Sequence, residues 1–182
     1  DPGQMVVIDD SGVRSIMYVP QEEKVQKALC VFEYIYFARS DSNIDGQSVY
    51  MARLNMGREL ARETKYDADL VMSIPDSGTT AALGYSRESG IPFGEGLIKN
   101  RYMGRTFIKP DQKQRDLAVR MKLNAVPEVV AGKRIVLIDD SIVRGTTSGI
   151  IVRMLKEAGA KEVYMCVSSP AIEFPCHYGI DT

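Results

Sequence analysis

One stretch of the sequence, RIVLIDDSIVRGTTS at residues 134–148, limits the possible folds more strongly than any other. Its apolar run, Ile135 to Ile138, indicates a buried strand, and two adjacent carboxylates follow at Asp139 and Asp140. A polar turn comes next, and then a segment with the apolar spacing of a helix. This order suits a ligand that carries both hydroxyl groups and a phosphate, so it predicts a sugar-phosphate site.

The polar turn is typical of a phosphate site, because backbone N–H groups, hydroxyls and the partial positive charge of a helix N-terminus all favour an anion. The residues that offer these groups are Arg144, Gly145, Thr146, Thr147 and Ser148. An ordinary Ser/Thr helix cap is the alternative interpretation, and Thr146 or Thr147 is suited to both roles.

The carboxylates of Asp139 and Asp140 have the chemistry to accept hydrogen bonds from a ribose diol or to lie near a magnesium ion. The alternative is a capping Asp beside a solvated neighbour. A second polar turn follows another apolar run, and in isolation it is a commonplace strand-to-helix connection. Its residues are Asp76, Ser77, Gly78 and Thr79.

Strand and helix patterns alternate along the chain. Strands are expected at 70–75, 91–98, 134–139 and 162–169, with a hairpin at 5–19 and a strand-like run at 30–37. Helices are expected at 48–63, 79–90 and 147–158. The first helix takes its spacing from Val49, Ala52, Met56 and Leu60. This alternation predicts an α/β fold with a mostly parallel sheet, whose ligands bind beyond the carboxyl ends of the strands.

The segment from Lys99 to about Ala125 differs from the rest, because it is dense in Lys and Arg and shows no convincing strand. Such a length of weakly structured chain inside a compact domain is typical of a lid, a binding loop or a disordered segment. Its later cations are expected to form a solvated basic face: Lys113, Arg115 and Lys122.

Composition narrows the classes of function. The chain has 182 residues, with 23 Lys and Arg against 24 Asp and Glu, and this net charge of −1 argues against general nucleic-acid or anionic-membrane binding. There is no apolar run of the roughly 18 residues that a membrane span needs, and no signal peptide is visible. The three cysteines do not suggest a disulfide framework, so a cytoplasmic protein is expected.

Residues 138–148, IDDSIVRGTTS, resemble the phosphoribosyl-pyrophosphate (PRPP) motif of the type I phosphoribosyltransferases. The segments FEYIYFARSDS (32–42), KNRYMGRTFI (99–108) and YGID (178–181) make the chain similar to the amidophosphoribosyltransferase branch of that family. Other members end the motif in a Thr-Gly-Gly-Thr-like turn, whereas Arg-Gly-Thr-Thr at 144–147 is the form of this branch.

The resemblance implies the type I phosphoribosyltransferase fold with a flexible lid loop, and a magnesium-dependent reaction in which ammonia displaces pyrophosphate from C1 of PRPP. The product would be 5-phosphoribosylamine, in the first step of de novo purine biosynthesis. Glutamine supplies the ammonia in the intact enzymes, purine nucleotides are expected to inhibit, and a homo-oligomer is expected. A non-catalytic PRPP-sensing regulator and a nucleobase phosphoribosyltransferase are the alternatives.

The resemblance also implies roles for single residues. Asp139 and Asp140 would receive the ribose hydroxyls and the magnesium shell, and would stabilise the positive charge that develops at C1. Ser77, in the loop expected to bind pyrophosphate, is a candidate metal contact. Lys99 and Arg101 would contact the leaving group and count as catalytic, and Arg105 lies beside them, whereas residues 144–148 would hold the 5-phosphate.

Two cysteines and both ends of the chain take their interpretation from the resemblance. Cys30 and Cys176 match positions where one branch places two of the four ligands of a [4Fe-4S] cluster, and soft thiolates suit iron. A buried free thiol is the alternative, and it is the one preferred for Cys166. Residues 1–22 are expected to be the end of a glutaminase domain, and 23–182 a phosphoribosyltransferase domain that lacks its C-terminal region.

Overall fold

The chain forms two compact units, Asp1–Cys30 and Val31–Thr182, and each is described by itself. The structure is a computed structural model that describes residues 3–18, 28–102, 117, 119–143, 145–174 and 176–177. Most of the expected lid, together with Arg105, Lys113, Arg115 and Arg144, lies outside the described residues.

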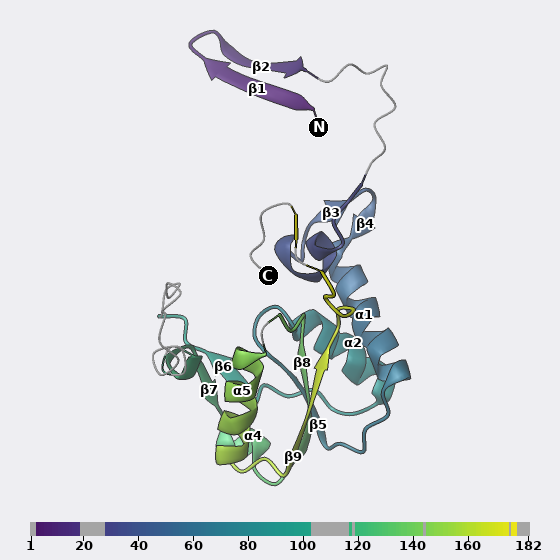
Figure 1. Cartoon of the computed structure of the whole chain (residues 1–182), viewed down its shortest axis with the longest axis vertical. Helices are drawn as coiled ribbons and strands as arrows, with labels where there is room; N and C mark the ends of the chain where they lie inside the picture. Colours follow the sequence, from purple (N-terminus) through teal and green to yellow (C-terminus); the bar gives the residue numbers. More distant parts are fainter. Residues whose placement is uncertain are drawn as a thin grey trace. The chain divides into compact units, whose positions relative to one another are not determined.

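The first unit contains a two-stranded antiparallel hairpin, β1 (Gln4–Asp9) and β2 (Gly12–Met17), drawn in purple in Figure 1. Asp9 pairs with Gly12 across the turn, which confirms the hairpin expected from the sequence. Apolar side chains on both faces of the hairpin are exposed: Met5, Val6, Ile8, Val13, Ile16 and Met17.

The second unit is built on a parallel sheet with the strand order β5-β8-β9 (Figure 1). The strands are β5 (Leu70–Ser73), β8 (Arg134–Asp139) and β9 (Glu162–Val167). Leu70 pairs with Ile135, and Ile135 with Val163, so the three carboxyl ends meet at one edge of the sheet. This arrangement confirms the predicted α/β class.

Helices cover both faces of the sheet, because alternate strand residues point to opposite sides. One face packs Val71 and Val136 against α2 (Thr79–Ser89), which in turn packs on α1 (Val49–Glu63). The other face packs Met72 and Leu137 against α5 (Thr146–Glu157). Three further elements contribute to this second core: β6 (Leu97–Lys99), β7 (Leu123–Ala125) and α4 (Pro127–Val130).

The helix limits agree with the sequence to within a residue or two, but of the four apolar residues that indicated α1 only Val49 is fully buried. The Ser48 hydroxyl accepts from Met51 N at 3.3 Å as a cap of α1, and Gly90 ends α2 in the left-handed conformation. The buried positions of α1 are Val49, Arg53, Leu54, Gly57 and Ala61. At three of the four apolar positions the buried residue lies one place further along, because α1 approaches α2 through Gly57, where no large side chain fits.

The strand-like run at 30–37 was also predicted wrongly, since Glu33–Phe37 form a π-helical turn, η1. Only Ile35 is buried in this turn, and Ala38 N donates to Glu33 O at 3.0 Å. A short ribbon, β3 (Asn43–Ile44) and β4 (Gln47–Ser48), then leads into α1.

The run at 91–98 forms a strand only at its end. Phe93 makes a single parallel bridge to Val71, and the chain then leaves the sheet. Gly94 and Gly96 lie so close to the side chains of Leu70, Met72 and Val130 that a Cβ atom would require these side chains to shift. The described ends of the basic segment pair as β6 and β7, which corrects the expectation that it holds no strand.

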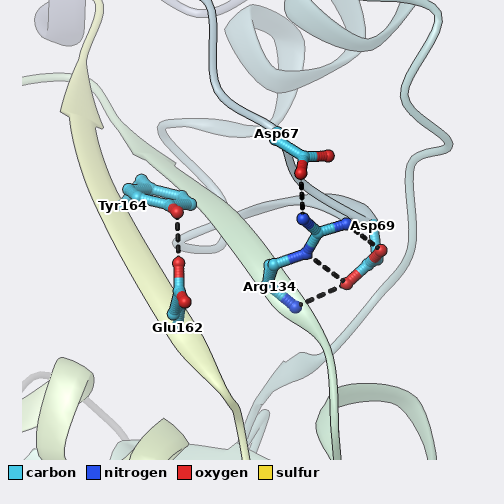
Figure 2. Close-up of polar contacts among 5 residues, drawn as sticks. All are labelled: Asp67, Asp69, Arg134, Glu162 and Tyr164. Atoms are coloured by element: carbon cyan, nitrogen blue, oxygen red, sulfur yellow. Dashed lines mark hydrogen bonds and ion pairs between the residues drawn. The ribbon is translucent and has the colours of Figure 1, made fainter.

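A charged cluster holds the start of β8, at the end of the strand opposite to Asp139 (Figure 2). Arg134 donates from Nε and Nη2 to the Asp69 carboxylate at 3.1 and 2.8 Å, and from Nη1 to Asp67. Beside it, Tyr164 donates to Glu162 on β9. These contacts join the chain before β5 to β8, so they stabilise the register of the sheet.

None of the described helices is both long enough and apolar enough to cross a lipid bilayer.

Candidate functional site

The two acids lie at the carboxyl end of β8, as the sequence predicted. Backbone hydrogen bonds fix this end, because Ser168 N and Ser169 N donate to the carbonyls of Asp139 and Asp140 at 3.1 and 3.0 Å. Asp140 N donates to the Asp139 carboxylate at 2.9 Å. The Asp140 side chain is buried, with 6% of its surface exposed.

Asp139 lies in an environment that disfavours its charge. Burial, and then the neighbouring charge of Asp140, raise the pKa of Asp139 to about 6. Hydrogen bonds from Asp140 N and the Ser77 hydroxyl oppose this shift without cancelling it. A carboxylate whose charge is disfavoured in this way is expected to gain from a cation or from hydroxyl donors placed beside it.

The turn at 76–79 lies against the acids. The Ser77 hydroxyl donates to Asp139 Oδ1 at 3.4 Å across 62 residues of sequence. Gly78 is required here, because a Cβ at this position would lie 2.4 Å from the carbonyl oxygen of Ile138. Thr79 begins α2, and its hydroxyl lies 3.1 Å from that of Ser73. The structure therefore brings both predicted turns to one end of the sheet.

Lys99 joins the same group of residues. Its Nζ donates to Asp76 Oδ2 at 2.6 Å, and both side chains are at least half exposed. The strand β6 places Lys99 at this point, and no local sequence pattern predicts its pairing with Asp76. Arg101 is exposed in the turn that follows β6. The site therefore combines a positive charge at Lys99, hydroxyls in the turn at 76–79 and the carboxylates of Asp139 and Asp140.

The predicted phosphate turn forms the N-terminus of α5, but its capping differs from the expectation. Gly145 is the cap residue, with φ 68°, and no side chain of the described residues caps the helix. The alternative interpretation, in which Thr146 or Thr147 caps α5, therefore does not hold, since the helix begins at Thr146. Thr146 and Thr147 are exposed and Ser148 is half-buried, so their hydroxyls remain available to a ligand.

The three cysteines differ in their exposure. Cys30 is exposed and belongs to the first unit, whereas Cys176 is half-buried in the second, and Cys166 is buried in the core. Within the described ranges, no group of three His, Cys, Asp or Glu side chains is placed to hold a metal ion.

Sequence reasoning missed one buried charge, Arg53 on α1. Its exposed fraction is 7%, and its guanidinium donates to the carbonyls of Tyr34 and Ala38. The signal was present in the sequence, because Arg53 lies four residues after Val49 and four before Gly57, on the stripe that is buried.

Comparisons with known proteins agree with this geometry. The family described as phosphoribosyl transferase domain matches residues 50–170. A protein of Archaeoglobus fulgidus named amidophosphoribosyltransferase is 57% identical over 180 residues, which cover 99% of this chain and 39% of the relative. One of Bacillus subtilis with the same name is 55% identical over 182 residues, or 100% of this chain and 38% of the relative.

Two solved structures have the same fold over almost the whole chain. One, described as the allosteric regulatory enzyme of purine biosynthesis, has a TM-score of 0.82 and 54% identity, and covers 99% of this chain and 38% of its own. The other is glutamine PRPP amidotransferase from B. subtilis complexed with ADP and GMP, with a TM-score of 0.81, 54% identity and coverages of 99% and 39%. The chain thus spans about two fifths of the length of these relatives.

Proposed function

Because the chain belongs to the phosphoribosyltransferase domain family, we propose that it carries the phosphoribosyl-transfer site of an amidophosphoribosyltransferase. In the proposed reaction the lone pair of ammonia forms a bond to C1 of PRPP. The bond between C1 and the pyrophosphate oxygen breaks with its electron pair on pyrophosphate, and the new amine loses a proton. The product is 5-phosphoribosylamine.

One observation carries this proposal: the paired acids at the end of β8 lie between the start of α5 and the turn at 76–79. In the proposed complex the start of α5, with Gly145 to Ser148 and Arg144, binds the 5-phosphate through backbone N–H groups and hydroxyls. Asp139 and Asp140 accept hydrogen bonds from the ribose hydroxyls. Their negative charge favours the positive charge that develops at C1 as the leaving group departs.

The opposite side of the site is proposed to bind pyrophosphate. The turn at Asp76, Ser77, Gly78 and Thr79 leads into the N-terminus of α2, where backbone N–H groups would face the bound anion. Lys99 lies beside this turn, paired with Asp76, and Arg101 follows it. A highly charged leaving group is expected to draw Lys99 from Asp76, because pyrophosphate carries several negative charges and a carboxylate carries one.

The chain's oxygen ligands fit a magnesium ion. Mg²⁺ is commonly held by one or two carboxylates together with water and substrate phosphates, rather than by an all-protein cage. Asp139, Asp140 and the hydroxyl of Ser77 supply such ligands, since Ser77 lies 3.4 Å from Asp139. When bound, the ion would neutralise charge on the pyrophosphate.

A [4Fe-4S] cluster remains a proposal for the longer protein. Cys30 and Cys176 are two thiols in separate units, and a cluster of this kind needs four. The described residues therefore do not fit the cluster by themselves, and no step is derived from it. Iron and acid-labile sulfide analysis of the longer protein, with and without a Cys176→Ser substitution, tests this ligand assignment.

The longer protein is further proposed to obtain ammonia from glutamine, to be inhibited by purine nucleotides, to form a homo-oligomer and to be cytoplasmic. The name of one relative, a glutamine PRPP amidotransferase solved with ADP and GMP, supports the proposals on glutamine and nucleotides. Residues 1–22 are proposed to be the end of the glutamine-hydrolysing domain, and 23–182 the phosphoribosyltransferase domain without its C-terminal region.

The experiment that tests the site is calorimetric titration of PRPP with magnesium into this chain and into an Asp139→Asn, Asp140→Asn variant. The chain offers a matched control, because Ile-Asp-Asp-Ser occurs at 8–11 as well as at 138–141. An Asp9→Asn, Asp10→Asn variant removes the same charges from the hairpin turn. Binding that survives in the hairpin variant and disappears in the site variant is expected.

Acceptors are then compared by pyrophosphate release from PRPP with ammonia, glutamine or nucleobases. Of these acceptors, only ammonia is expected to release pyrophosphate from PRPP. Glutamine is expected to fail because its hydrolysis is proposed to require the longer protein. Release only with a nucleobase would favour a nucleobase phosphoribosyltransferase. Binding without release under any condition would favour a PRPP-sensing protein, and a folded chain that does not bind PRPP would overturn the site itself.

A further inference from the structure

The turn that is proposed to bind pyrophosphate carries a negative charge of its own. Asp76 lies in this turn, and 77% of its side chain is exposed. A carboxylate beside an anion-binding turn weakens the binding of an anion, because like charges repel each other. The charge of Asp76 therefore needs a reason other than direct contact with the leaving group.

Capping of α2 is not that reason. A carboxylate at a helix N-terminus commonly stabilises the helix by accepting hydrogen bonds from its first N–H groups. Here Gly78 is the cap residue of α2, and no side chain in the described part of the chain caps this helix. Gly78 N donates to Ile74 O at 3.2 Å, and Thr79 N donates to Asp76 O at 3.3 Å. Backbone groups therefore hold the turn without help from the Asp76 carboxylate.

The Asp76 carboxylate is bound instead to a cation from a distant strand. Its Oδ2 accepts from Lys99 Nζ at 2.6 Å, although the two residues lie 23 positions apart in the sequence. Lys99 ends β6, which belongs to the core on the opposite face of the sheet from α2. In the ligand-free chain, the cation that is proposed to bind the leaving group thus already has an anionic partner.

The surroundings of this ion pair are acidic. Ser77, the residue after Asp76, donates to Asp139 at 3.4 Å, so the turn lies against the paired acids. A pyrophosphate that takes Lys99 from Asp76 leaves this carboxylate without its described partner and beside a second anion. Binding of the leaving group therefore has to overcome both the ion pair and the repulsion that follows its loss.

We propose that the Asp76 carboxylate competes with pyrophosphate for Lys99 and so limits the affinity of the site for its leaving group; this rests on the function proposed above. Asp76 binds Lys99 while the site is empty, and its side chain contacts no ligand in the occupied site. The ligands it acts on are phosphate-type anions that need the charge of Lys99. A product that is held less tightly leaves the site more readily.

Two other roles of Asp76 predict different results. If Asp76 oriented Lys99 for the ligand or bound the magnesium ion, its removal would weaken the binding of pyrophosphate. If the ion pair contributed nothing, as is common for exposed side chains, its removal would leave the affinity unchanged. A competitor is distinguished from both, because removal of its charge makes the binding of pyrophosphate tighter.

The first measurement is calorimetric titration of pyrophosphate with magnesium into the parent chain, Asp76→Asn and Asp67→Asn. Asp67 is the matched control, because it is an exposed acid whose ion pair with Arg134 lies at the opposite end of β8 from the paired acids. Asp76→Asn is expected to bind pyrophosphate about two- to fivefold more tightly, as an exposed ion pair of up to about 1 kcal/mol implies. Asp67→Asn is expected to bind within about 1.5-fold of the parent, since solvent and salt screen a distant charge.

The second measurement repeats the substitution in a chain that lacks the cation. Asp76→Asn is expected to raise the affinity for pyrophosphate less in a Lys99→Met background than in the parent, because no lysine is left to be released. Such a cycle isolates the interaction between the two side chains. An equal gain in both backgrounds would show that Asp76 acts by repulsion alone, and would overturn the competition for Lys99.

The outcomes separate this proposal from the proposed function. If Asp76→Asn binds pyrophosphate no more tightly than Asp67→Asn, the competition is overturned, while a parent chain that binds PRPP still supports the proposed function. A parent chain that binds PRPP but not pyrophosphate would also overturn the competition alone. A folded parent chain that binds neither ligand would overturn both proposals.

Discussion

At the scale of single residues, the paired acids show that this chain accepts a cost in stability at its proposed site. The pKa of Asp139 is raised to about 6, so the folded state binds its proton more tightly than an unfolded chain does. Above that pH the carboxyl is ionised in both the folded and the unfolded chain, and its burial then lowers the stability of the folded state. Residues at functional sites commonly lower the stability of the ligand-free protein, because the interactions that offset their burial form only when the ligand binds.

Replacing Asp139 with Asn is expected to stabilise the ligand-free chain and to abolish PRPP binding. The gain develops as the pH rises from about 4 to about 6 and is complete above that range. It disappears below about pH 4, where the carboxyl is protonated in both states. Its upper bound is roughly 2–3 kcal/mol for a shift of this size. Urea unfolding in magnesium-free buffer at two pH values measures it, and an equal or lower stability at pH 7.5 would contradict the prediction.

Lys99 is expected to contribute to binding of the leaving group. A Lys99→Met variant should bind pyrophosphate about 10- to 100-fold more weakly, since a hydrogen bond to a charged group contributes roughly 1.5–3 kcal/mol. Lys133→Met is the control, because Lys133 is an exposed cation that precedes β8, at the opposite end of the strand from the acids. Equal affinities of the two variants, measured by competition with PRPP, would remove Lys99 from the site.

The repeated tetrapeptide Ile-Asp-Asp-Ser shows what the sequence could and could not predict at this scale. At 8–11 it makes a hairpin turn in which Ser11 donates to Asp9, and at 138–141 it ends a buried strand. Flanking residues distinguished the two sites correctly, because a glycine follows the first and a helical pattern follows the second. Contacts between distant residues, such as Lys99 with Asp76, gave no local signal.

At the scale of elements, the packing of α1 on α2 depends on two glycines. A Cβ at Gly57 would lie 1.8 Å from Ala81 O, and one at Gly84 would lie 2.0 Å from Leu54 O. Such distances require the helices to move apart, since backbone atoms cannot turn aside. The two glycines therefore allow α1 and α2 to approach closely, and this approach determines where α2 begins relative to the acids.

Substituting either glycine with Ala is expected to destabilise the chain by about 1–3 kcal/mol or more, the usual cost of overpacking. Gly149→Ala provides a control of opposite sign, because Gly149 lies within α5 with nothing near its Cβ position. In a helix interior Ala is favoured over Gly by about 1 kcal/mol. Urea midpoints of the three variants measure both effects, and a stable Gly57→Ala would contradict the observed helix contact.

The elements that the sequence predicted well are those whose pattern agrees with their packing. Strands β5, β8 and β9 carry continuous apolar runs, as expected for a parallel sheet with two covered faces. The π-helical turn η1 was missed because its aromatic residues suit a strand, while its shape depends on a guanidinium from α1. Tertiary contacts of this kind override local preference.

At the scale of the whole molecule, acid stability is expected to depend on the cluster around Arg134. Hydrogen bonds from Arg134 hold the pKa of Asp69 well below its usual range, so the folded state keeps this carboxylate ionised. Its contribution is therefore present above about pH 4, the unfolded value, and is lost as the pH falls further. The free energy of unfolding, measured as the pH falls below about 4, follows the loss of this contribution.

An Asp69→Asn variant is expected to be less stable than the parent at pH 7 and to lose less stability on acidification, so that the two curves converge below pH 4. Asp10→Asn serves as the control, because it removes an exposed carboxylate of the hairpin. Thermal unfolding between pH 7 and pH 3 provides the comparison. Parallel curves for parent and Asp69→Asn would show that the cluster does not govern the acid transition.

The division into two units leads to a prediction for the whole chain. All described residues of the proposed site and both packed cores lie within Val31–Thr182, whereas the hairpin exposes apolar side chains on both faces. An isolated two-stranded hairpin is at best marginally stable in water, so its faces are expected to pack elsewhere in a longer protein.

A chain that begins at Val31 should therefore keep its fold and its site. It is expected to bind magnesium and PRPP within about twofold of the parent in calorimetry, and to aggregate less, because the removed faces are apolar. A loss of affinity in a folded Val31–Thr182 chain would show that the hairpin contributes to the site, and that the two units depend on each other.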